Sequence, residues 1–276
     1  MKIRLPSFSS MDTFSRCPRQ YAEDVIKGRT PANKAMERGT HLHNSLEAAA
    51  KIYLDKGPDW EAAIDGIIAA PPEGILSQEE IESYMNRARL IVKDLVPTPG
   101  GVEAWFDDIG AAHGLPVLPI RGKIDMISST ALLTSEQARP YNVEEAGAVV
   151  DYKTISGEHR IKNSWEAKRS MQLKIYALAT GINRAGFVYF PPKTAARAIF
   201  VKFTDEELRI AHVWLTGQLN AILACWSRFL GRTVTWLDEF EPIGDWAAWP
   251  LSHPDNMLCS KKWCGHWKTC IGAPAP

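Results

Sequence analysis

Two short stretches decide the fold: GKID at residues 122–125 and VVDYKT at residues 149–154. Each has the apolar, β-branched character of a strand and carries an acidic residue near its end. In the second stretch, Asp151 and Lys153 are two positions apart, so they lie on the same face of the strand. The sequence therefore predicts that Asp125 and Asp151 converge from two strands beside the amine of Lys153.

Two acids and an amine in this arrangement have a specific chemical use. Carboxylates that meet at a strand end can hold Mg²⁺ or Mn²⁺, hard cations that prefer oxygen ligands. The ammonium of Lys153 can orient or help deprotonate the attacking water and offset charge on a phosphate. An Asp-x-Lys pattern alone is common on strands and is usually a surface ion pair, so the neighbouring elements decide its meaning.

Helices on both sides of these strands supply further polar groups. The segment at residues 36–57 has helical spacing and places Gly39, His43 and Glu47 on one face, because positions four apart are neighbours on a helix. Downstream, Gln172 and Tyr176 are also four apart in a helix expected at residues 164–180 and stopped by Gly181. His41 does not share the spacing of His43 from Gly39 and is expected at the surface.

The remaining segments predict an α/β chain with helices first and strands later. We expect a first helix interrupted at Pro18 and capped by Ser9 or Ser10, followed later by a helix from the Ser77/Glu80 capping box to about Val96. Residues 57–77, rich in Pro and Gly, predict mainly a loop. Strands are expected at residues 102–109, 115–128, 146–154, 185–190 and 197–203, and a long helix at residues 205–230.

The ordered motifs resemble those of the RecB-like PD-(D/E)XK nucleases. This group includes nuclease domains of bacterial recombination complexes, CRISPR-adaptation nucleases and many phage exonucleases. The similarity runs through nearly the whole chain, and it rests on the following residues in order: Gly39, His43, Glu47, Glu103, Gly122, Asp125, Asp151, Tyr152, Lys153, Thr154, Gln172 and Tyr176.

The resemblance implies a fold and a role for each matching residue. It implies a restriction-endonuclease-like core, a central mixed sheet flanked by helices. His43, Asp125 and Asp151 would bind the catalytic Mg²⁺ or Mn²⁺, with the Tyr152 carbonyl as a further ligand, and Lys153 would be the catalytic lysine. Gln172 and Tyr176 would contact substrate near the scissile phosphate, whereas Glu47 and Glu103 are more often structural in such positions.

The cysteines suggest a second metal site. In an intracellular chain, clustered cysteines point to metal rather than to disulfides. The resemblance implies a 4Fe-4S cluster held by Cys17 and a late trio, and Zn²⁺ is the alternative, because the four residues between Cys259 and Cys264 exceed the usual family spacing. Cys225 lies in an apolar helix and is expected in the core. The expected cluster ligands are Cys17, Cys259, Cys264 and Cys270.

These assignments divide one nuclease domain, residues 1–276, into three consecutive parts. We expect a helical part at residues 1–100, the nuclease core at residues 101–231 and a cysteine-clustered tail at residues 232–276. The tail is rich in tryptophan with little periodicity, so the late cysteines are the candidates for ordering it.

Charge and composition fit a nucleic-acid enzyme without a basic coat. The formal net charge is zero, so binding of DNA must come from an uneven distribution of charge. No signal peptide or membrane span is visible, which predicts a cytoplasmic protein without a membrane partner. Residues 158–202 form a basic stretch, in which the acidic residues are only Glu158 and Glu166. Its basic residues are Arg160, Lys162, Lys168, Arg169, Lys174, Arg184, Lys193, Arg197 and Lys202.

The leading hypothesis is metal-dependent hydrolysis of DNA, as an exonuclease on single strands or DNA ends in recombination, repair or phage DNA processing. Exposed aromatic residues such as Trp165 are candidates for stacking on bases. The chain has no Gly-x-x-x-x-Gly-Lys-Ser/Thr motif, so any unwinding requires a helicase or recombination partner. Two alternatives stay open: a non-catalytic DNA-binding or assembly module of a recombination or CRISPR-adaptation complex, and a zinc-stabilised protein whose motif order is accidental.

Overall fold

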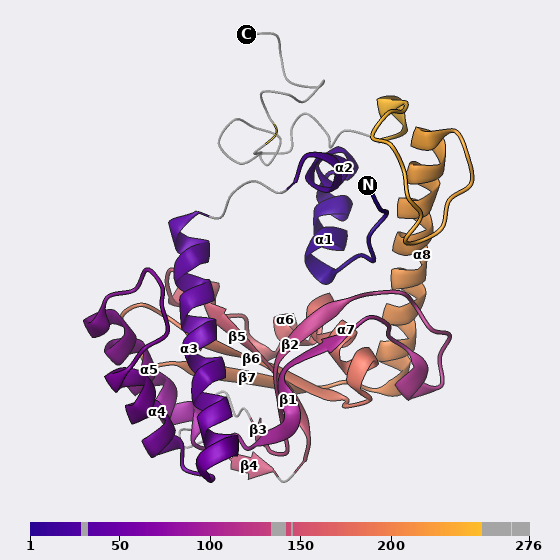
Figure 1. Ribbon diagram of the computed structural model, residues 1–276. Helices are drawn as coiled ribbons and strands as arrows, with labels where there is room; N and C mark the ends of the chain where they lie inside the picture. The colour runs from indigo at the N-terminus through magenta and orange to yellow at the C-terminus, as the bar shows by residue number, and fades with distance from the viewer. Residues whose placement is uncertain (29–32, 134–141, 145, 250–265, 267–276) are drawn as a thin grey trace. The chain divides into compact units, whose positions relative to one another are not determined.

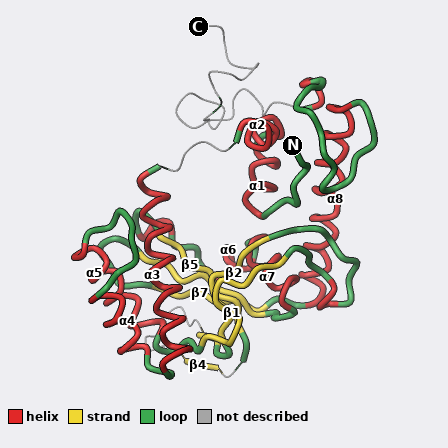
Figure 2. The backbone as a smooth tube through the Cα atoms, in the orientation of Figure 1, coloured by secondary structure: helices red, strands yellow, loops and turns green. Residues whose placement is uncertain are grey.

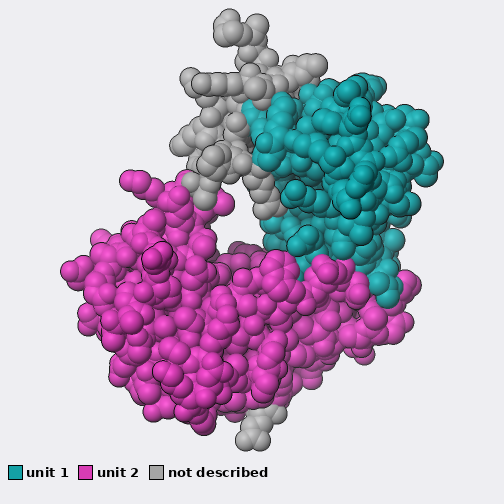
Figure 3. Space-filling model, viewed as in Figure 1, with its two compact units in different colours: residues 1–31, 117–122, 212–276 teal, residues 32–116, 123–211 magenta. Residues whose placement is uncertain are grey.

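The computed structural model describes residues 1–28, 33–133, 142–144, 146–249 and 266. The chain forms two compact units (Figure 3), and each combines segments that are distant in the sequence. Unit 1 contains residues 1–31, 117–122 and 212–276, and unit 2 contains residues 32–116 and 123–211. This division differs from the three consecutive parts that the sequence suggested.

Unit 2 is organised around a five-stranded mixed sheet with the strand order β1-β2-β5-β6-β7 (Figure 1). The pairs β2–β5 and β6–β7 are antiparallel, whereas β5–β6 is parallel. The strands are β1 (Pro97–Phe106), β2 (Gly122–Ser128), β5 (Ala148–Thr154), β6 (Arg184–Phe190) and β7 (Arg197–Lys202).

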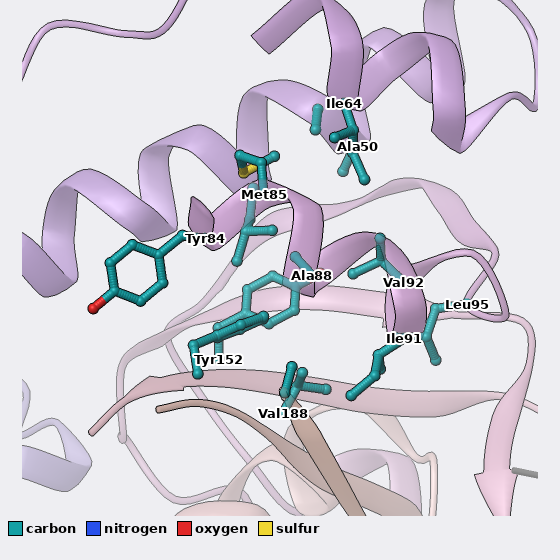
Figure 4. Packing of buried hydrophobic residues seen from close by; sticks show 14 of the residues in the cluster. Ala50, Ile64, Tyr84, Met85, Ala88, Ile91, Val92, Leu95, Tyr152 and Val188 are labelled. Atoms are coloured by element: carbon teal, nitrogen blue, oxygen red, sulfur yellow. The ribbon is translucent and has the colours of Figure 1, made fainter. Parts of the chain in front are cut away.

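Three helices cover one face of this sheet: α3 (Lys34–Lys56), α4 (Trp60–Ala69) and α5 (Gln78–Val92). Their apolar residues form a single core with alternate residues of the strands, including Val150 and Tyr152 from β5. Figure 4 shows Tyr152 and Val188 beneath the side chains of α5. The residues of β5 that alternate with Val150 and Tyr152 therefore point to the opposite face of the sheet.

The helices α6 (Ser164–Lys168) and α7 (Met171–Thr180) follow β5 in the chain, and α7 contacts β5 and β6. The two helices are separated at Arg169 and Ser170, where one continuous helix was expected (Figure 2). Helix α7 ends at Gly181, whose φ of 76° is a left-handed conformation that glycine adopts at low cost. The predicted stop at Gly181 is therefore confirmed.

Several local predictions need correction. Ser7, rather than Ser9 or Ser10, caps α1 (Phe8–Arg16), since its side chain accepts from the Ser10 N–H. The expected loop at residues 57–77 contains α4, capped by Asp59. Helix α5 has the predicted Ser77/Glu80 capping box but ends at Val92. A short antiparallel pair, β3 (Ala131–Leu133) and β4 (Asn142–Glu144), was not predicted.

Unit 1 contains α1, α2 (Pro18–Lys27) and the larger part of α8 (Asp205–Leu230). Its described tail packs on α8 through aromatic rings: Trp249 and Phe240 each lie 4.8 Å from Trp226 between ring centroids. The Arg19 guanidinium lies 3.9 Å from the centre of the Trp246 ring. The tail up to Trp249 therefore has an aromatic core of its own, although the sequence suggested that it depends on the late cysteines.

Candidate active site

The site begins where β2 and β5 stop pairing. Their ladder joins residues 126–128 to residues 148–150, and Asp125 and Asp151 come next on the two strands. At this point the Tyr152 N–H donates to Asp125 Oδ2 at 2.7 Å instead of to a strand carbonyl. The side chain of Asp125 thereby replaces a backbone acceptor at the fork between the strands.

Asp151 is almost fully buried and is surrounded by side-chain donors. Lys153 Nζ lies 2.5 Å from Asp151 Oδ2, as the two-residue period of the strand predicts. Gln172 Nε2 donates to Asp151 Oδ1 at 2.8 Å, and the Tyr176 hydroxyl donates to the same oxygen at 3.2 Å. Gln172 also donates to the Tyr176 hydroxyl at 2.9 Å, so one turn of α7 fixes this carboxylate.

His43 reaches the site from α3. Its Nδ1 lies 3.5 Å from Asp125 Oδ2, and its ring meets the Tyr152 ring edge-on at 6.1 Å between centroids. One turn earlier on α3, Gly39 faces Thr154, and a β-carbon there would lie 3.7 Å from the threonine hydroxyl. The Gly39/His43 spacing therefore aligns α3 with the end of β5.

The two carboxylates are in different electrostatic states. Burial raises the pKa of Asp151, and the charge of Asp125 raises it further; together they outweigh the lowering effect of Lys153. Burial also raises the pKa of Asp125, but the hydrogen bond and charge of His43 and the Tyr152 N–H produce a net lowering. For His43, burial lowers the pKa, and the hydrogen bond to Asp125 and the charges of Asp125 and Asp151 raise it overall.

The donor set fits a hard divalent cation. Asp151 Oδ2 is buried without a hydrogen-bond partner among the described residues, and the Lys153 ammonium is its ion-pair partner. The two carboxylates are the ligand type that suits Mg²⁺ or Mn²⁺, whereas the imidazole of His43 would add a softer nitrogen ligand. Among the described residues, no group of three or more His, Cys, Asp or Glu side chains is already arranged so that it could hold a metal ion. The side chain of Tyr152 belongs to the opposite face and packs in the core.

His41 was expected at the surface, and this prediction is wrong. Its side chain is buried, its Nδ1 accepts from the Leu76 N–H at 3.0 Å, and its Nε2 lies 2.8 Å from the Pro72 carbonyl oxygen. The ring also packs directly on Gly74, where a β-carbon would clash with it. His41 therefore connects α3 to the segment before α5, while His43, two residues later, points to the carboxylates.

The two glutamates have ion-pair partners of their own. Glu47 contacts Lys51 one turn along α3. Glu103 contacts Lys123 from β2, and its backbone has a positive φ of 57°, which is unusual for a non-glycine residue. Lys123 was not among the predicted site residues, although it stands two positions before Asp125 and so on the same strand face.

The predicted cysteine site falls largely on residues that the structure does not describe. Cys259, Cys264 and Cys270 lie outside the described residues. Cys17 is described: it caps α2, and its sulfur accepts from the Gln20 N–H at 3.4 Å. Cys225 is buried in α8, as predicted.

The mixed sheet and the clustered acids, amine and imidazole define an α/β protein of the nuclease type. Residues 6–270 match the family model of the PD-(D/E)XK nuclease superfamily. The chain belongs to this superfamily. The predicted fold class, a restriction-endonuclease-like α/β core with flanking helices, is confirmed.

Solved structures show more distant similarity. A protein described as a candidate exonuclease from Eubacterium rectale is 14% identical, with 80% of each chain covered and a TM-score of 0.43. SSO0001 is 14% identical over 73% of this chain and 85% of its own, with a TM-score of 0.28. LHK-Exo in complex with dAMP is 11% identical over 67% of this chain and 92% of its own, with a TM-score of 0.29. Similarity at this level carries no argument about substrate.

No curated protein matches the chain. In the part of the chain that the structure describes, none of the helices is long and apolar enough to span a membrane.

Proposed function

We propose that this protein is a metal-dependent deoxyribonuclease of the RecB-like branch that hydrolyses phosphodiester bonds. The observation that carries the proposal is the direct contact of Asp151 with Lys153, beside the contact of Asp125 with His43. The two acids stand at the fork between β2 and β5, where a phosphate can meet both an amine and a cation-binding group.

Each of the predicted site residues has a role in this proposal. Asp125, Asp151 and His43 would hold Mg²⁺ or Mn²⁺, which supplies Lewis-acid stabilisation of negative charge on the phosphate. Lys153 orients the attacking water through its ammonium and offsets charge on the phosphate oxygens. Gln172 and Tyr176 keep Asp151 in place through their hydrogen bonds and face the scissile phosphate.

We further propose that the enzyme acts as an exonuclease on single-stranded DNA or on DNA ends, in recombination, repair or phage DNA processing. Support comes from the motif order and from the basic stretch at residues 158–202, which can follow a phosphate backbone. Trp165, with 65% of its surface exposed, offers a face on which a base can stack. A helicase or recombination partner would supply the single strand.

Digestion of end-labelled single- and double-stranded DNA tests the activity and its direction. Purified protein with Mg²⁺ or Mn²⁺ should release short products from a labelled end. The Lys153→Ala variant should show no comparable cleavage. Binding of either cation should also raise the melting temperature of wild-type protein, because ligands of the native state stabilise it. Normal cutting by the lysine variant would exclude the proposed site, and DNA binding without cleavage by wild type would favour the non-catalytic module.

For the cysteines, we propose a 4Fe-4S cluster held by Cys17 and the three late cysteines, with Zn²⁺ as the alternative. The support is the one-plus-three distribution of thiols and the partly exposed position of Cys17 at the start of α2. Purified protein should show visible absorbance that dithionite bleaches, and Cys264→Ala should remove it and lower the melting temperature. Cys225→Ala is the matched control and should keep the absorbance. A colourless protein with stoichiometric zinc would contradict the iron assignment.

A further inference from the structure

Two lysine ammonium groups share one aromatic ring beside the site. Phe187 lies on β6 directly opposite Asp151 in the parallel β5–β6 ladder. Lys153 Nζ lies 5.5 Å from the centre of the Phe187 ring, and Lys162 Nζ lies 5.1 Å from the same centre. Lys162 therefore brings a second positive charge close to Lys153, although it comes from the loop between β5 and α6.

The main chain at Lys162 is held in place from both sides. Its backbone is hydrogen-bonded to the Tyr189 phenol, which belongs to β6 two residues after Phe187. The next residue, Asn163, is the N-cap of α6, and its side chain and that of Glu166 exchange hydrogen bonds with each other's backbone N–H at 2.8 and 2.9 Å. Because this capping box fixes the loop, the position of the Lys162 side chain depends on the fold rather than on a freely moving segment.

The charge of Lys162 is available to a ligand. The residue is exposed, and it makes no ion pair with any acidic side chain in the described part of the chain. Three other lysines of unit 2 have ion-pair partners: Lys153 pairs with Asp151, Lys123 with Glu103 and Lys168 with Glu207. A polyanion that approaches Lys153 therefore also meets the ammonium of Lys162, which lies 5.1 Å from the centre of the same Phe187 ring.

We propose that Lys162 is a substrate-binding residue that contacts a DNA phosphate next to the scissile one. This inference rests on the proposed function, because it assumes that the scissile phosphate lies at Lys153. Successive phosphates of a B-DNA strand rise by roughly 3.4 Å along the axis, and their separation in space is larger because the backbone winds around that axis. Two ammonium groups, each less than 6 Å from one ring centre, are thus close enough to serve phosphates that are neighbours or nearly so.

A contact with a non-reacting phosphate has a distinctive kinetic effect. It is present equally in the ground state and the transition state, so its loss raises KM and leaves kcat unchanged. It also contributes one ion pair to the salt dependence of binding, where each neutralised phosphate of a single strand contributes a slope of about −0.7 in log K against log salt. Loss of a residue that acts on the reacting atoms would lower kcat instead.

The experiment compares Lys162→Ala with a matched lysine control. Lys56 is an exposed lysine in the last turn of α3 of the same unit, outside the basic stretch, and also without an ion pair among the described residues. Affinity for a labelled single-stranded oligonucleotide is measured in EDTA over a series of KCl concentrations, and steady-state kinetics are measured with Mg²⁺. Melting temperatures of both variants should equal that of wild type, because both side chains are exposed.

Lys162→Ala should bind roughly tenfold more weakly at low salt, the loss expected for one charge-assisted hydrogen bond. Its salt slope should fall by about 0.7, with KM raised and kcat retained. Lys162→Arg should restore most of the affinity, and Lys56→Ala should resemble wild type.

Three results would overturn the inference while leaving the nuclease proposal intact: wild-type affinity and slope in Lys162→Ala, an equal loss in Lys56→Ala, or a fall in kcat at constant KM. Wild-type protein that neither binds nor cuts DNA would instead refute the proposed function, and this inference with it.

Discussion

The two faces of strand β5 show how one short segment serves two purposes. Val150 and Tyr152 point to one side and join the apolar core under α3, α4 and α5. Asp151 and Lys153 point to the other side and form the ion pair that α7 surrounds with donors. The core face excludes water and fixes the strand, and that rigidity permits a buried, imperfectly compensated carboxylate on the opposite face. Stability and activity should therefore be separable by mutation, residue by residue.

The largest expected effect comes from the site face. Asp151→Asn should reduce DNA cleavage by at least about 10³-fold, the order found when one preorganised electrostatic group is removed. The melting temperature should stay the same or rise, because the amide oxygen can still accept from Gln172 and Tyr176 while the buried charge is gone. Parallel measurements of cleavage rate and thermal unfolding check both parts. Loss of activity that merely follows loss of folded protein would break the contrast between the faces.

The core face should show the opposite behaviour. Ile91 of α5 is 2% exposed and packs in the cluster with Val188 and Tyr152 (Figure 4). Ile91→Ala should lower the free energy of unfolding by about 2–5 kcal/mol through lost burial and a residual cavity. Urea titration measures this change, and cleavage per folded molecule should remain near that of wild type. A large fall in kcat at temperatures where the variant is folded would contradict the expectation.

The two histidines of α3 provide a smaller and closer comparison. His41→Ala should lower the free energy of unfolding by about 1–3 kcal/mol, because the buried Leu76 N–H loses its acceptor. Its cleavage activity should persist. His43→Ala should keep most of the stability and require more Mg²⁺ or Mn²⁺ for half-maximal cleavage. Denaturation and metal-titration curves for the pair would show whether the roles are separated in this way or shared.

The smallest expected effect is a pH dependence of stability in metal-free protein. The pKa of His43 is raised above its ordinary value of 6.5, so the charged contact with Asp125 stabilises the fold below that value. This contribution, on the order of 1 kcal/mol or less for a partly exposed pair, is lost as pH rises through the folded pKa. Melting temperatures across this range should fall more in wild type than in His43→Ala. Parallel curves for the two proteins would assign the pH dependence to other groups.

The parts of the site that sequence reasoning could predict depend on regular geometry. Asp151 and Lys153 share a face because strands have a period of two, and Gln172 and Tyr176 share a face because helices have a period near four. The expected roles of these residues remain predictions, but the structure brings their side chains together.

The features that sequence reasoning missed depend on long-range packing or on local breaks in the chain's regular structure that no residue type signals. His41 is buried by the segment that ends at Leu76, and a helical pattern cannot reveal that cover. Helix α4 was overlooked because prolines and glycines flank its apolar residues, although Asp59 supplies a regular N-cap. The break between α6 and α7 occurs at Arg169 and Ser170, with neither proline nor glycine to signal it.

The hydrogen bond from the Tyr152 N–H to Asp125 makes one backbone amide a reporter of the site. Protonation of the carboxylate, or its recruitment by another electropositive group, alters the acceptor of a single peptide proton. In a ¹⁵N-labelled sample, the chemical shift and the solvent exchange rate of that amide should follow the state of Asp125. The opening between β2 and β5 thus provides a spectroscopic signal at the site without any added chromophore.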